Sequence, residues 1–239
     1  VKGFDPKDYL EVNEILRTDR YEQLAVAAAA QAVAESGVKG TVEPERFSVI
    51  FGTGIGGIST FETEHGKLIE KGPRRVSPLF IPMMISNMAA GTTAMRRGLR
   101  GLGPCPVTAC ASGAYAVGDA FHYIRDGYAE VMLCGGTEAS ITPMSIGGFT
   151  SMKALCQSED PNRASIPFDA ERSGFVLGEG AGILLLEELE HAKARGAKIL
   201  AEVVGYGATG DAFHITSPAE DGSGAAKAME LCVKEAGIS

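Results

Sequence analysis

The chain of 239 residues carries 22 lysines and arginines against 30 aspartates and glutamates, a formal net charge of −8 at neutral pH. This negative balance disfavours binding along nucleic acids and to anionic membrane surfaces. Seven basic residues nevertheless crowd positions 67–100 and leave a local basic patch possible. We therefore expect neither nucleic acid nor a membrane as a partner.

The five cysteines are widely spaced and include no C-x-x-C pair. An odd number without such a pair indicates neither a disulfide framework nor a zinc site. No apolar run approaches the roughly 18 residues that cross a membrane as a helix. The sequence therefore predicts a globular cytoplasmic protein with no metal and no bound cofactor.

Capping signals predict a first amphipathic helix that begins after Asp19 and ends at Gly37. Glu22, three residues after Asp19, completes a capping box, and glycine is a typical C-terminal stop. The apolar run 47–51 follows and is typical of a buried strand. The chain thus opens with a helix that packs closely and a strand of the core.

A glycine-rich turn then leads into a helix predicted to begin near Ser59. Gly52, Gly54 and Gly57 match G-x-G-x-x-G, a fingerprint of dinucleotide binding. That fingerprint also needs an acidic residue after a second strand about twenty residues on, whereas residues 66–71 have a helical pattern. A nucleotide-binding module is therefore the least favoured hypothesis, behind a plain tight turn.

Residues 107–113 place a cysteine where a short strand is expected to end and a helix to begin. Pro104 and Pro106 suit a strand near a sheet edge, and a helical pattern runs on to Gly127. The free N–H groups and the dipole at a helix N-terminus lower the pKa of a thiol from about 8.5 to between roughly 3.5 and 7.5. Cys110 is thus a candidate nucleophile, and the alternative is an inert buried cysteine.

The remaining elements follow in order. The helix after Cys110 is expected to bury a face of apolar residues, namely Ala114, Val117, Phe121 and Ile124. Residues 130–134 predict a strand that Gly135 and Gly136 end and that completes a parallel β-α-β unit. Residues 143–180 form a long connection of the kind that is usually functional or disordered. Strands are predicted at 182–186 and 200–204, with a helix ended by Gly196 between them, and a last helix runs from Gly222 to Ala236.

Several motifs, in the same order along the chain, resemble those of the β-ketoacyl-[acyl-carrier-protein] synthases of fatty-acid synthesis, and most closely synthase II. They lie at residues 72–78, 103–104, 108–113, 135–139, 167–172, 174–182 and 209–214. The resemblance implies a thiolase-like α/β fold of two similar halves, each with a mixed five-stranded sheet, stacked as α-β-α-β-α layers. It assigns residues 1–198 to the first half, which carries the nucleophile, and residues 199–239 to the truncated beginning of the second. It also implies a preceding segment with the first strand, so we expect a fragment.

The same resemblance implies a reaction. Cys110 would accept an acyl chain from acyl carrier protein as a thioester and would offer its backbone N–H to the oxyanion. Malonyl carrier protein would then lose carbon dioxide and condense with the thioester, giving a 3-oxoacyl chain longer by two carbons. Ile55 and Phe149 are expected to line the acyl pocket, with Phe80 reaching across the interface of a homodimer. The histidines and the lysine that the family uses lie beyond residue 239, so we expect residues 1–239 alone to carry an acyl group without condensing it.

One departure and three alternatives accompany this resemblance. Val12, Ile15 and Leu16 stand where the synthase II pattern usually carries basic residues for the acidic carrier protein. A polyketide ketosynthase would share the cysteine and differ in its acyl pocket. A chain-length factor, the catalytically silent partner of some ketosynthases, normally lacks the cysteine. A nucleotide-binding module remains a distant third.

Overall fold

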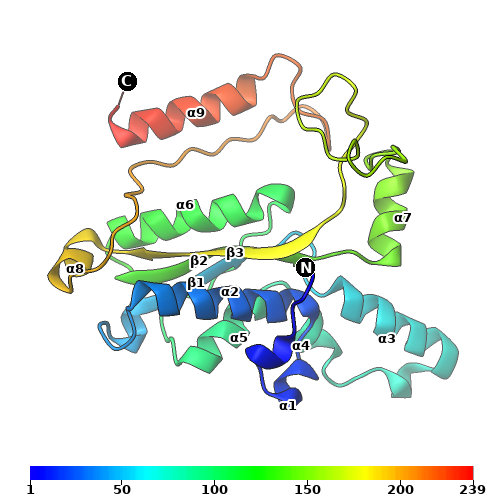
Figure 1. Ribbon diagram of the computed structural model, residues 1–239, viewed down its shortest axis with the longest axis horizontal. Coiled ribbons are helices and arrows are strands. Elements are labelled where there is room, and N and C mark those ends of the chain that lie inside the picture. The colour runs from blue at the N-terminus through cyan, green and yellow to red at the C-terminus, as the bar shows by residue number, and fades with distance from the viewer. Residues whose placement is uncertain (239) are drawn as a thin grey trace.

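The computed structural model describes residues 1–238. Its centre is a mixed sheet in the order β1-β2-β3, made of β1 (Phe47–Gly52), β2 (Val131–Ala139) and β3 (Glu179–Glu187). β1 and β2 run parallel, and β3 runs antiparallel to β2 (Figure 1). Val131 lies opposite Phe47 on one side and opposite Glu187 on the other. The chain therefore has an α/β architecture, as the sequence predicts.

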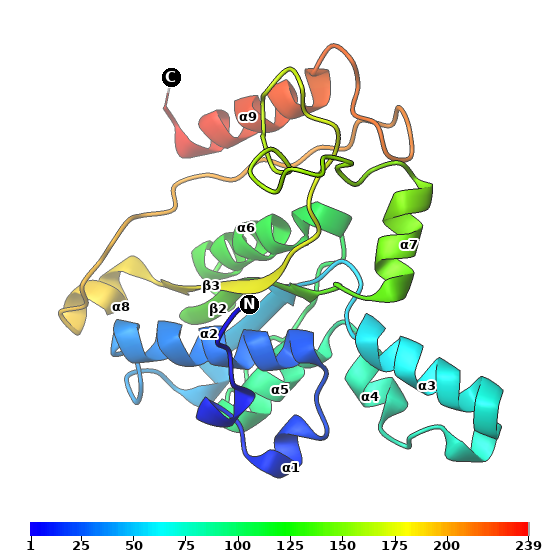
Figure 2. The same ribbon diagram turned by 45° about the vertical axis from the view of Figure 1, so that its right-hand side comes forward.

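The described residues form nine α-helices, several of which cover the two faces of the sheet. They are α1 (Val12–Ile15), α2 (Arg20–Ser36), α3 (Ile58–Lys71), α4 (Phe80–Met84), α5 (Met88–Arg97), α6 (Ser112–Arg125), α7 (Pro143–Ser151), α8 (Leu189–Ala194) and α9 (Ser223–Ala236). Figure 1 shows α2 and α5 on one face, and α6 with α9 beyond it on the other. Figure 2 shows α3 and α4 side by side, away from the sheet. Within residues 1–238 no helix has both the length and the apolar character needed to cross a membrane.

Helix α2 confirms the first predicted helix, including its ends. The Asp19 side chain accepts a hydrogen bond from the Tyr21 N–H (3.3 Å), while the Glu22 carboxylate accepts one from the Asp19 N–H (3.0 Å). These reciprocal bonds satisfy N–H groups that a helix start leaves without partners. Gly37 ends the helix with a φ of 63°, a left-handed conformation that suits glycine.

Two apolar clusters hold the sheet between its helices. On one face, strand residues such as Val49 and Leu133 pack with Leu24 and Ala25 of α2. On the other face, strand residues such as Met132 pack against α6. Because β1 and β2 are covered on both faces, their residues read as continuous apolar runs rather than as an alternating pattern.

Helix α6 buries part of the predicted face, because Val117 and Ile124 pack against the core while the fully buried positions lie beside them. Ser112, Ala116 and Ala120 are buried, whereas Ala114 is exposed and Phe121 only half-buried. The buried positions are small, so the helix axis lies close to the sheet. The prediction weighted large apolar residues, but here the smallest residues face the core.

Two predicted strands are not formed, and the sheet has three strands in the described part of the chain rather than five. Near residues 103–108 the Leu102 carbonyl accepts one hydrogen bond from Val49 (2.9 Å), and Pro104 and Pro106, which carry no N–H, follow directly. Residues 200–204 run extended without a strand partner. The β-α-β prediction around Cys110 is therefore wrong in its first strand, because the parallel neighbour of β2 is β1.

Strand β2 also runs past the glycines that were expected to end it. Gly135 has a φ of 144°, and a Cβ there would lie 2.0 Å from the Gly182 carbonyl oxygen of β3. Glycine thus permits a close approach of two strands instead of a turn. In the long connection, α7 occupies Pro143–Ser151, and residues 152–178 make one isolated bridge, between Leu155 and Phe175.

Candidate active site

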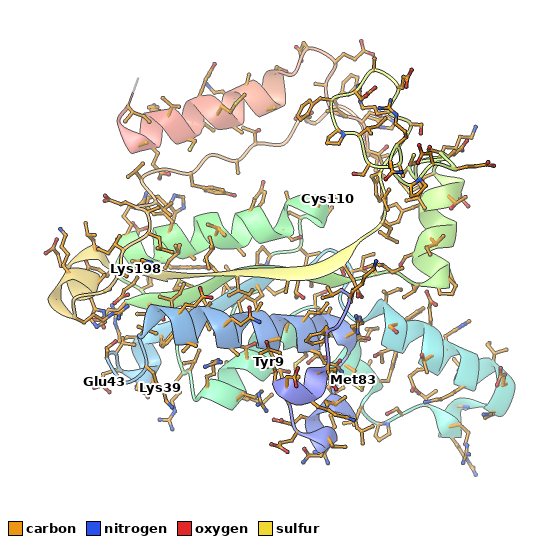
Figure 3. The ribbon with its side chains drawn as sticks, viewed as in Figure 1. Tyr9, Lys39, Glu43, Met83, Cys110 and Lys198 are labelled. Carbon is orange, nitrogen blue, oxygen red and sulfur yellow. The ribbon has the colours of Figure 1, made fainter. Side chains whose placement is uncertain are left out.

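The thiol of Cys110 is exposed at the start of α6. A short 3-10 turn, Ala109–Ala111, carries the cysteine, and α6 begins with the next residue, Ser112. Figure 3 shows Cys110 at this end of α6, on the sheet face that also carries α9. The exposure contradicts the alternative of an inert buried cysteine. The helix predicted to follow Cys110 is confirmed.

The side chain of Ser112 fixes the shape of the turn that presents Cys110. Its buried hydroxyl accepts a hydrogen bond from the Thr108 N–H (2.8 Å) and donates one to the Ala109 carbonyl (2.7 Å). Ala109, directly before the cysteine, has a φ of 52°. A left-handed alanine is strained and persists only where its surroundings impose it. Ser112 therefore holds a strained turn around the thiol.

Three glycines bring the strands against this turn. A Cβ on Gly52, the last residue of β1, would lie 2.2 Å from the Ser112 carbonyl oxygen. A Cβ on Gly113 would lie 3.3 Å from the Cα of Gly136 in β2. The N-terminal end of α6 thus rests directly on the backbone of the sheet. This contact fixes the position of Cys110 above the ends of β1 and β2.

The glycine turn after β1 is bound by a carboxylate of the protein itself. Glu138 of β2 accepts hydrogen bonds from the N–H groups of Gly54 (2.8 Å) and Ile55 (3.1 Å), and Ser140 donates to its other oxygen (2.8 Å). In a dinucleotide site such N–H groups bind phosphate. Here they are occupied, and helix α3 follows where a nucleotide site needs a second strand. The geometry therefore argues against a nucleotide-binding module.

The expected pocket residues lie in three different places. The loop of Ile55 contacts the cysteine turn, since a Cβ on Gly54 would lie 3.6 Å from the Ala109 carbonyl oxygen. Phe149 of α7 packs edge to face on Phe175, with ring centroids 5.2 Å apart. Phe80 of α4 packs against Phe61 of α3, at 6.2 Å. The structure thus brings Ile55 to the cysteine turn and places Phe80 in a separate aromatic pair.

The other cysteines differ from Cys110 in burial and environment. Burial raises the pKa of the Cys134 thiol to about 12 and raises that of Cys105 above its usual range. Hydrogen bonds from the Ser173 hydroxyl and the Ser158 N–H lower the pKa of Cys156. Cys156 is therefore the thiol that must be controlled for in any labelling experiment.

The four histidines make local contacts away from the thiol. His122 pairs with Glu235 (2.9 Å), and His191 pairs with Glu187 (2.6 Å). His65 stacks on Phe61, and His214 accepts hydrogen bonds from the two N–H groups at residues 216–217. No group of three or more metal-ligating side chains gathers anywhere in residues 1–238.

Sequence reasoning from single residues missed Ser112 and Glu138 as positioning residues. Both lie in the motifs quoted for the family resemblance, but nothing in their spacing shows which backbone groups they bind. The partners of Ser112 are local but depend on the shape of the turn, whereas Glu138 reaches a loop more than 80 residues away in the chain. A serine two residues after Cys110, at the expected start of the helix, is the available sequence signal.

Comparison with known proteins adds three relatives. The chain is 50% identical over 240 aligned residues to a 3-oxoacyl-[acyl-carrier-protein] synthase 2 of Synechocystis sp., covering all of this chain and 58% of that protein. It superposes on a β-ketoacyl synthase of Burkholderia phymatum with a TM-score of 0.88 and 32% identity, over 99% of this chain and 58% of the other. A third match is a ketosynthase solved with its type II PKS acyl-carrier protein (TM-score 0.87, 36% identity), over 92% of this chain and 56% of that one.

The chain therefore spans less than two thirds of each of these relatives. The fold that it shares with the solved ketosynthases is the thiolase-like α/β fold expected from its motifs. The family model described as the N-terminal domain of β-ketoacyl synthase matches residues 3–192, which include the Cys110 turn and all three strands. On this evidence the chain belongs to the β-ketoacyl synthase family.

Proposed function

We propose that this chain carries the acyl-accepting part of a 3-oxoacyl-[acyl-carrier-protein] synthase of fatty-acid synthesis, with Cys110 as its nucleophile. The observation that carries the proposal is the exposed thiol on a strained turn at the start of α6, braced by Ser112. Family membership and the 50% identity to a synthase 2 support this choice of reaction.

In the proposed first step, the Cys110 sulfur attacks the thioester carbonyl of an acyl carrier protein. A carbon–sulfur bond to Cys110 forms while the bond to the carrier's sulfur breaks, so the acyl group moves and the carrier thiol is released. The developing oxyanion needs a fixed donor, and the Cys110 N–H at the helix start is the one that this turn offers. One such donor typically lowers the activation free energy of the step by about 3 kcal/mol.

The second step is the decarboxylating condensation with malonyl carrier protein, which lengthens the chain by two carbons. The histidines of residues 1–238 are engaged in the contacts described above. We therefore propose that a polypeptide of residues 1–239 alone takes up an acyl group and forms no carbon–carbon bond. Measurable formation of 3-oxoacyl product by that polypeptide would overturn this part of the proposal.

The acyl chain is proposed to lie beside Ile55 and Phe149. The loop of Ile55 touches the cysteine turn. Phe149 lies in the last turn of α7, just before the long connection. Apolar walls suit an acyl chain. Phe80 is proposed to serve the same pocket from the partner subunit of a homodimer. A narrower wall shortens the accepted chain, so Ile55→Phe should shift the preference toward shorter acyl groups, and an unchanged preference would count against this pocket.

The organisation of the whole protein is also a proposal. Residues 1–198 are assigned to the first thiolase-like half and residues 199–239 to the beginning of the second. The end of the family match at residue 192 supports that boundary. The cytoplasm is proposed as the location, since the five cysteines are free thiols and free thiols suit a reducing compartment.

The nucleophile is tested by acyl uptake from a radiolabelled acyl carrier protein, comparing Cys110→Ser with Cys156→Ser. We expect the first variant to lose uptake, because it removes the attacking sulfur, and the second to keep it. Cys156 is the matched control, since its thiol also lies outside the core and its pKa is lowered. Full uptake by Cys110→Ser, or loss of uptake only in Cys156→Ser, would refute the assignment.

A polyketide ketosynthase is the second candidate, because one solved relative is a ketosynthase of a type II PKS, at 36% identity, and another is a ketosynthase with its chain length factor, at 33%. The greater identity to the fatty-acid enzyme favours the first candidate. The two differ in product: a fatty-acid synthase adds one unit to a reduced chain, whereas a polyketide enzyme adds several without reduction. Mass analysis of products made by the whole protein distinguishes them.

A further inference from the structure

A small hollow lies between the N-terminal segment, α2 and α5. It has a volume of about 140 Å³ and is lined by Tyr9, Val26, Ala30, Thr93, Arg96 and Arg97. Figure 3 shows Tyr9 below α2, on the opposite side of the sheet from Cys110. The volume equals that of roughly four to five molecules of liquid water. The hollow therefore admits a small ion but not a nucleotide or an acyl chain.

Thr93 brings a buried hydroxyl without a partner to this hollow. The residue is 1% exposed, and its Oγ1 has no hydrogen-bond partner within residues 1–238. The adjacent Thr92 differs, because its hydroxyl donates to Glu22 (2.8 Å). Buried hydroxyls in native proteins almost always have a partner, since leaving one unpaired costs free energy. The Thr93 hydroxyl is therefore a hydrogen-bond donor that the described residues leave unpaired beside the hollow.

Arg97 brings a positive charge that no neighbour neutralises. Burial and, to a lesser extent, the adjacent Arg96 lower its pKa, and among residues 1–238 no carboxylate opposes these two effects. Arginine nevertheless stays protonated in proteins. Arg96 is in a different situation, because it pairs with Glu14 and donates to the Tyr9 carbonyl (2.7 Å). One positive charge at the hollow is thus left without a counterion.

We propose that this hollow binds a small oxyanion, held by the Thr93 hydroxyl and the Arg97 guanidinium. An oxyanion supplies both missing partners at once: an acceptor for the hydroxyl and a negative charge for the guanidinium. Hydrogen bonds from a guanidinium to an anionic oxygen are among the strongest in proteins. The short aliphatic walls of Val26 and Ala30 limit the ligand to the size of phosphate or a short carboxylate.

The test measures binding of radiolabelled inorganic phosphate to the whole protein by equilibrium dialysis, with chloride used to hold the ionic strength constant. We expect saturable binding of one phosphate per chain. Thr93→Val and Arg97→Gln should each weaken it about tenfold or more, because each removes a hydrogen-bonding group. Arg100→Gln is the matched control, since Arg100 is exposed, pairs with Glu45 and lies outside the hollow.

A thermal melt of each variant guards against misfolding. Valine has the shape of threonine without the hydroxyl, so Thr93→Val should melt no lower than the wild type without phosphate, and only the wild type and Arg100→Gln should gain from added phosphate. Acetate in place of phosphate identifies the oxyanion: binding of either one at this hollow supports the proposal. No saturable binding of either anion, or equal weakening by Arg97→Gln and Arg100→Gln, would overturn it.

Discussion

Around Cys110, the polar side chains act by fixing the backbone. Ser112 is the clearest case, because one hydroxyl binds both the Thr108 N–H and the Ala109 carbonyl. The strain at Ala109, with its φ of 52°, is retained only while those two bonds hold the turn. In the proposed function, the reactivity of the Cys110 thiol therefore depends on a residue that does not touch the substrate.

Replacing Ser112 with alanine tests this dependence. We expect Ser112→Ala to lower the free energy of unfolding by about 1–2 kcal/mol, because two hydrogen bonds are lost at a half-buried turn, and to slow acyl transfer to Cys110. Ser59→Ala, at an exposed position on α3, is the control and should change either quantity little. Urea denaturation and acyl-transfer kinetics make the measurement. Unchanged kinetics would contradict the bracing role.

Glu22 shows a second residue-scale effect, in which burial governs a titration. The carboxyl group is 1% exposed and binds the Asp19 N–H and the Thr92 hydroxyl. Burial, opposed by these hydrogen bonds, raises its pKa from 4.5 to about 7. Between these two pH values the folded protein keeps a proton that the unfolded chain has released. Stability from this group is therefore present at low pH and falls as the pH rises toward 7.

Glu22→Gln removes this titration while keeping an acceptor for the Asp19 N–H. Between pH 4 and pH 8, the wild type should lose about 3 kcal/mol of its free energy of unfolding relative to the variant. This value follows from the rise in pKa from 4.5 to about 7, at 1.36 kcal/mol per pKa unit. Urea denaturation of both proteins across this range measures it. Curves that stay parallel at every pH would show that Glu22 has an ordinary pKa.

At the scale of elements, close backbone contacts determine where the turn that carries Cys110 lies. Helix α6 rests on β1 and β2 through glycines, and Gly52 leaves no room for a side chain against Ser112. Gly66 in α3 is a useful contrast, because a Cβ there would meet nothing within 4 Å. The same substitution should thus have opposite effects at the two sites.

We expect Gly52→Ala to destabilise the protein by about 2 kcal/mol or more, because a Cβ overlapping the Ser112 carbonyl forces the backbone to move. Gly66→Ala should stabilise it by roughly 0.5–1 kcal/mol, the usual gain in a helix interior. Thermal and urea denaturation of both variants check the signs. A Gly52→Ala protein that is as stable as wild type and transfers acyl groups normally would show that this close contact does not position the Cys110 turn.

The sequence predicted the elements whose signals are local. Helix α2 has its capping box and its terminal glycine, and α9 follows Gly222 and ends at Ala236, as expected. The strands expected before Cys110 and at 200–204 did not form, because a strand needs a partner and partners are set by tertiary structure. Gly135 and Gly136 were expected to end the strand. Instead they allow the backbone of β2 to lie close to its neighbours, which no local pattern reveals.

In the candidate site too, features with a local signal could be predicted, and features that depend on tertiary contacts could not. Cys110 and its helix could be predicted, because the thiol and the helical pattern are adjacent in the chain. The brace by Ser112 and the bond from Glu138 to the glycine turn depend on backbone geometry and long-range contacts. The resemblance to a family supplied the roles of Ile55, Phe80 and Phe149, which spacing alone does not indicate.

At the scale of the whole molecule, α9 is held to the rest of the protein through α6. The ring of Tyr206 lies on Gly118, where a Cβ would come within 2.4 Å of it. Glu235 of α9 accepts hydrogen bonds from the Arg125 guanidinium (2.6 Å) and the Tyr206 N–H (2.7 Å). These contacts are few, and the ion pair is exposed and contributes little. The attachment therefore runs through the segment of Tyr206, whose ring packs on α6 and whose neighbour Gly207 packs on α9, where a Cβ would lie 2.0 Å from the Ala228 carbonyl oxygen.

Tyr206→Ala should loosen α9 without affecting the central sheet. Losing about 1–2 kcal/mol of packing corresponds to roughly 5–30-fold faster amide hydrogen exchange in residues 223–236, with unchanged exchange in α2. Tyr128→Ala, at an exposed tyrosine in the loop that follows α6, is the control. Hydrogen exchange followed by mass spectrometry measures both. Equal protection of α9 in wild type and Tyr206→Ala would show that other contacts hold this helix.

The central claim is that Cys110 forms the acyl thioester, and it is tested most directly by mapping the acyl group on the unmodified protein. The whole protein is incubated with acyl carrier protein carrying a labelled acyl chain, digested, and analysed by peptide mass spectrometry. Our account predicts the acyl mass on the peptide containing Cys110, and its release by hydroxylamine. An acyl mass on Cys156 or another residue, with an unmodified Cys110 peptide, would contradict it.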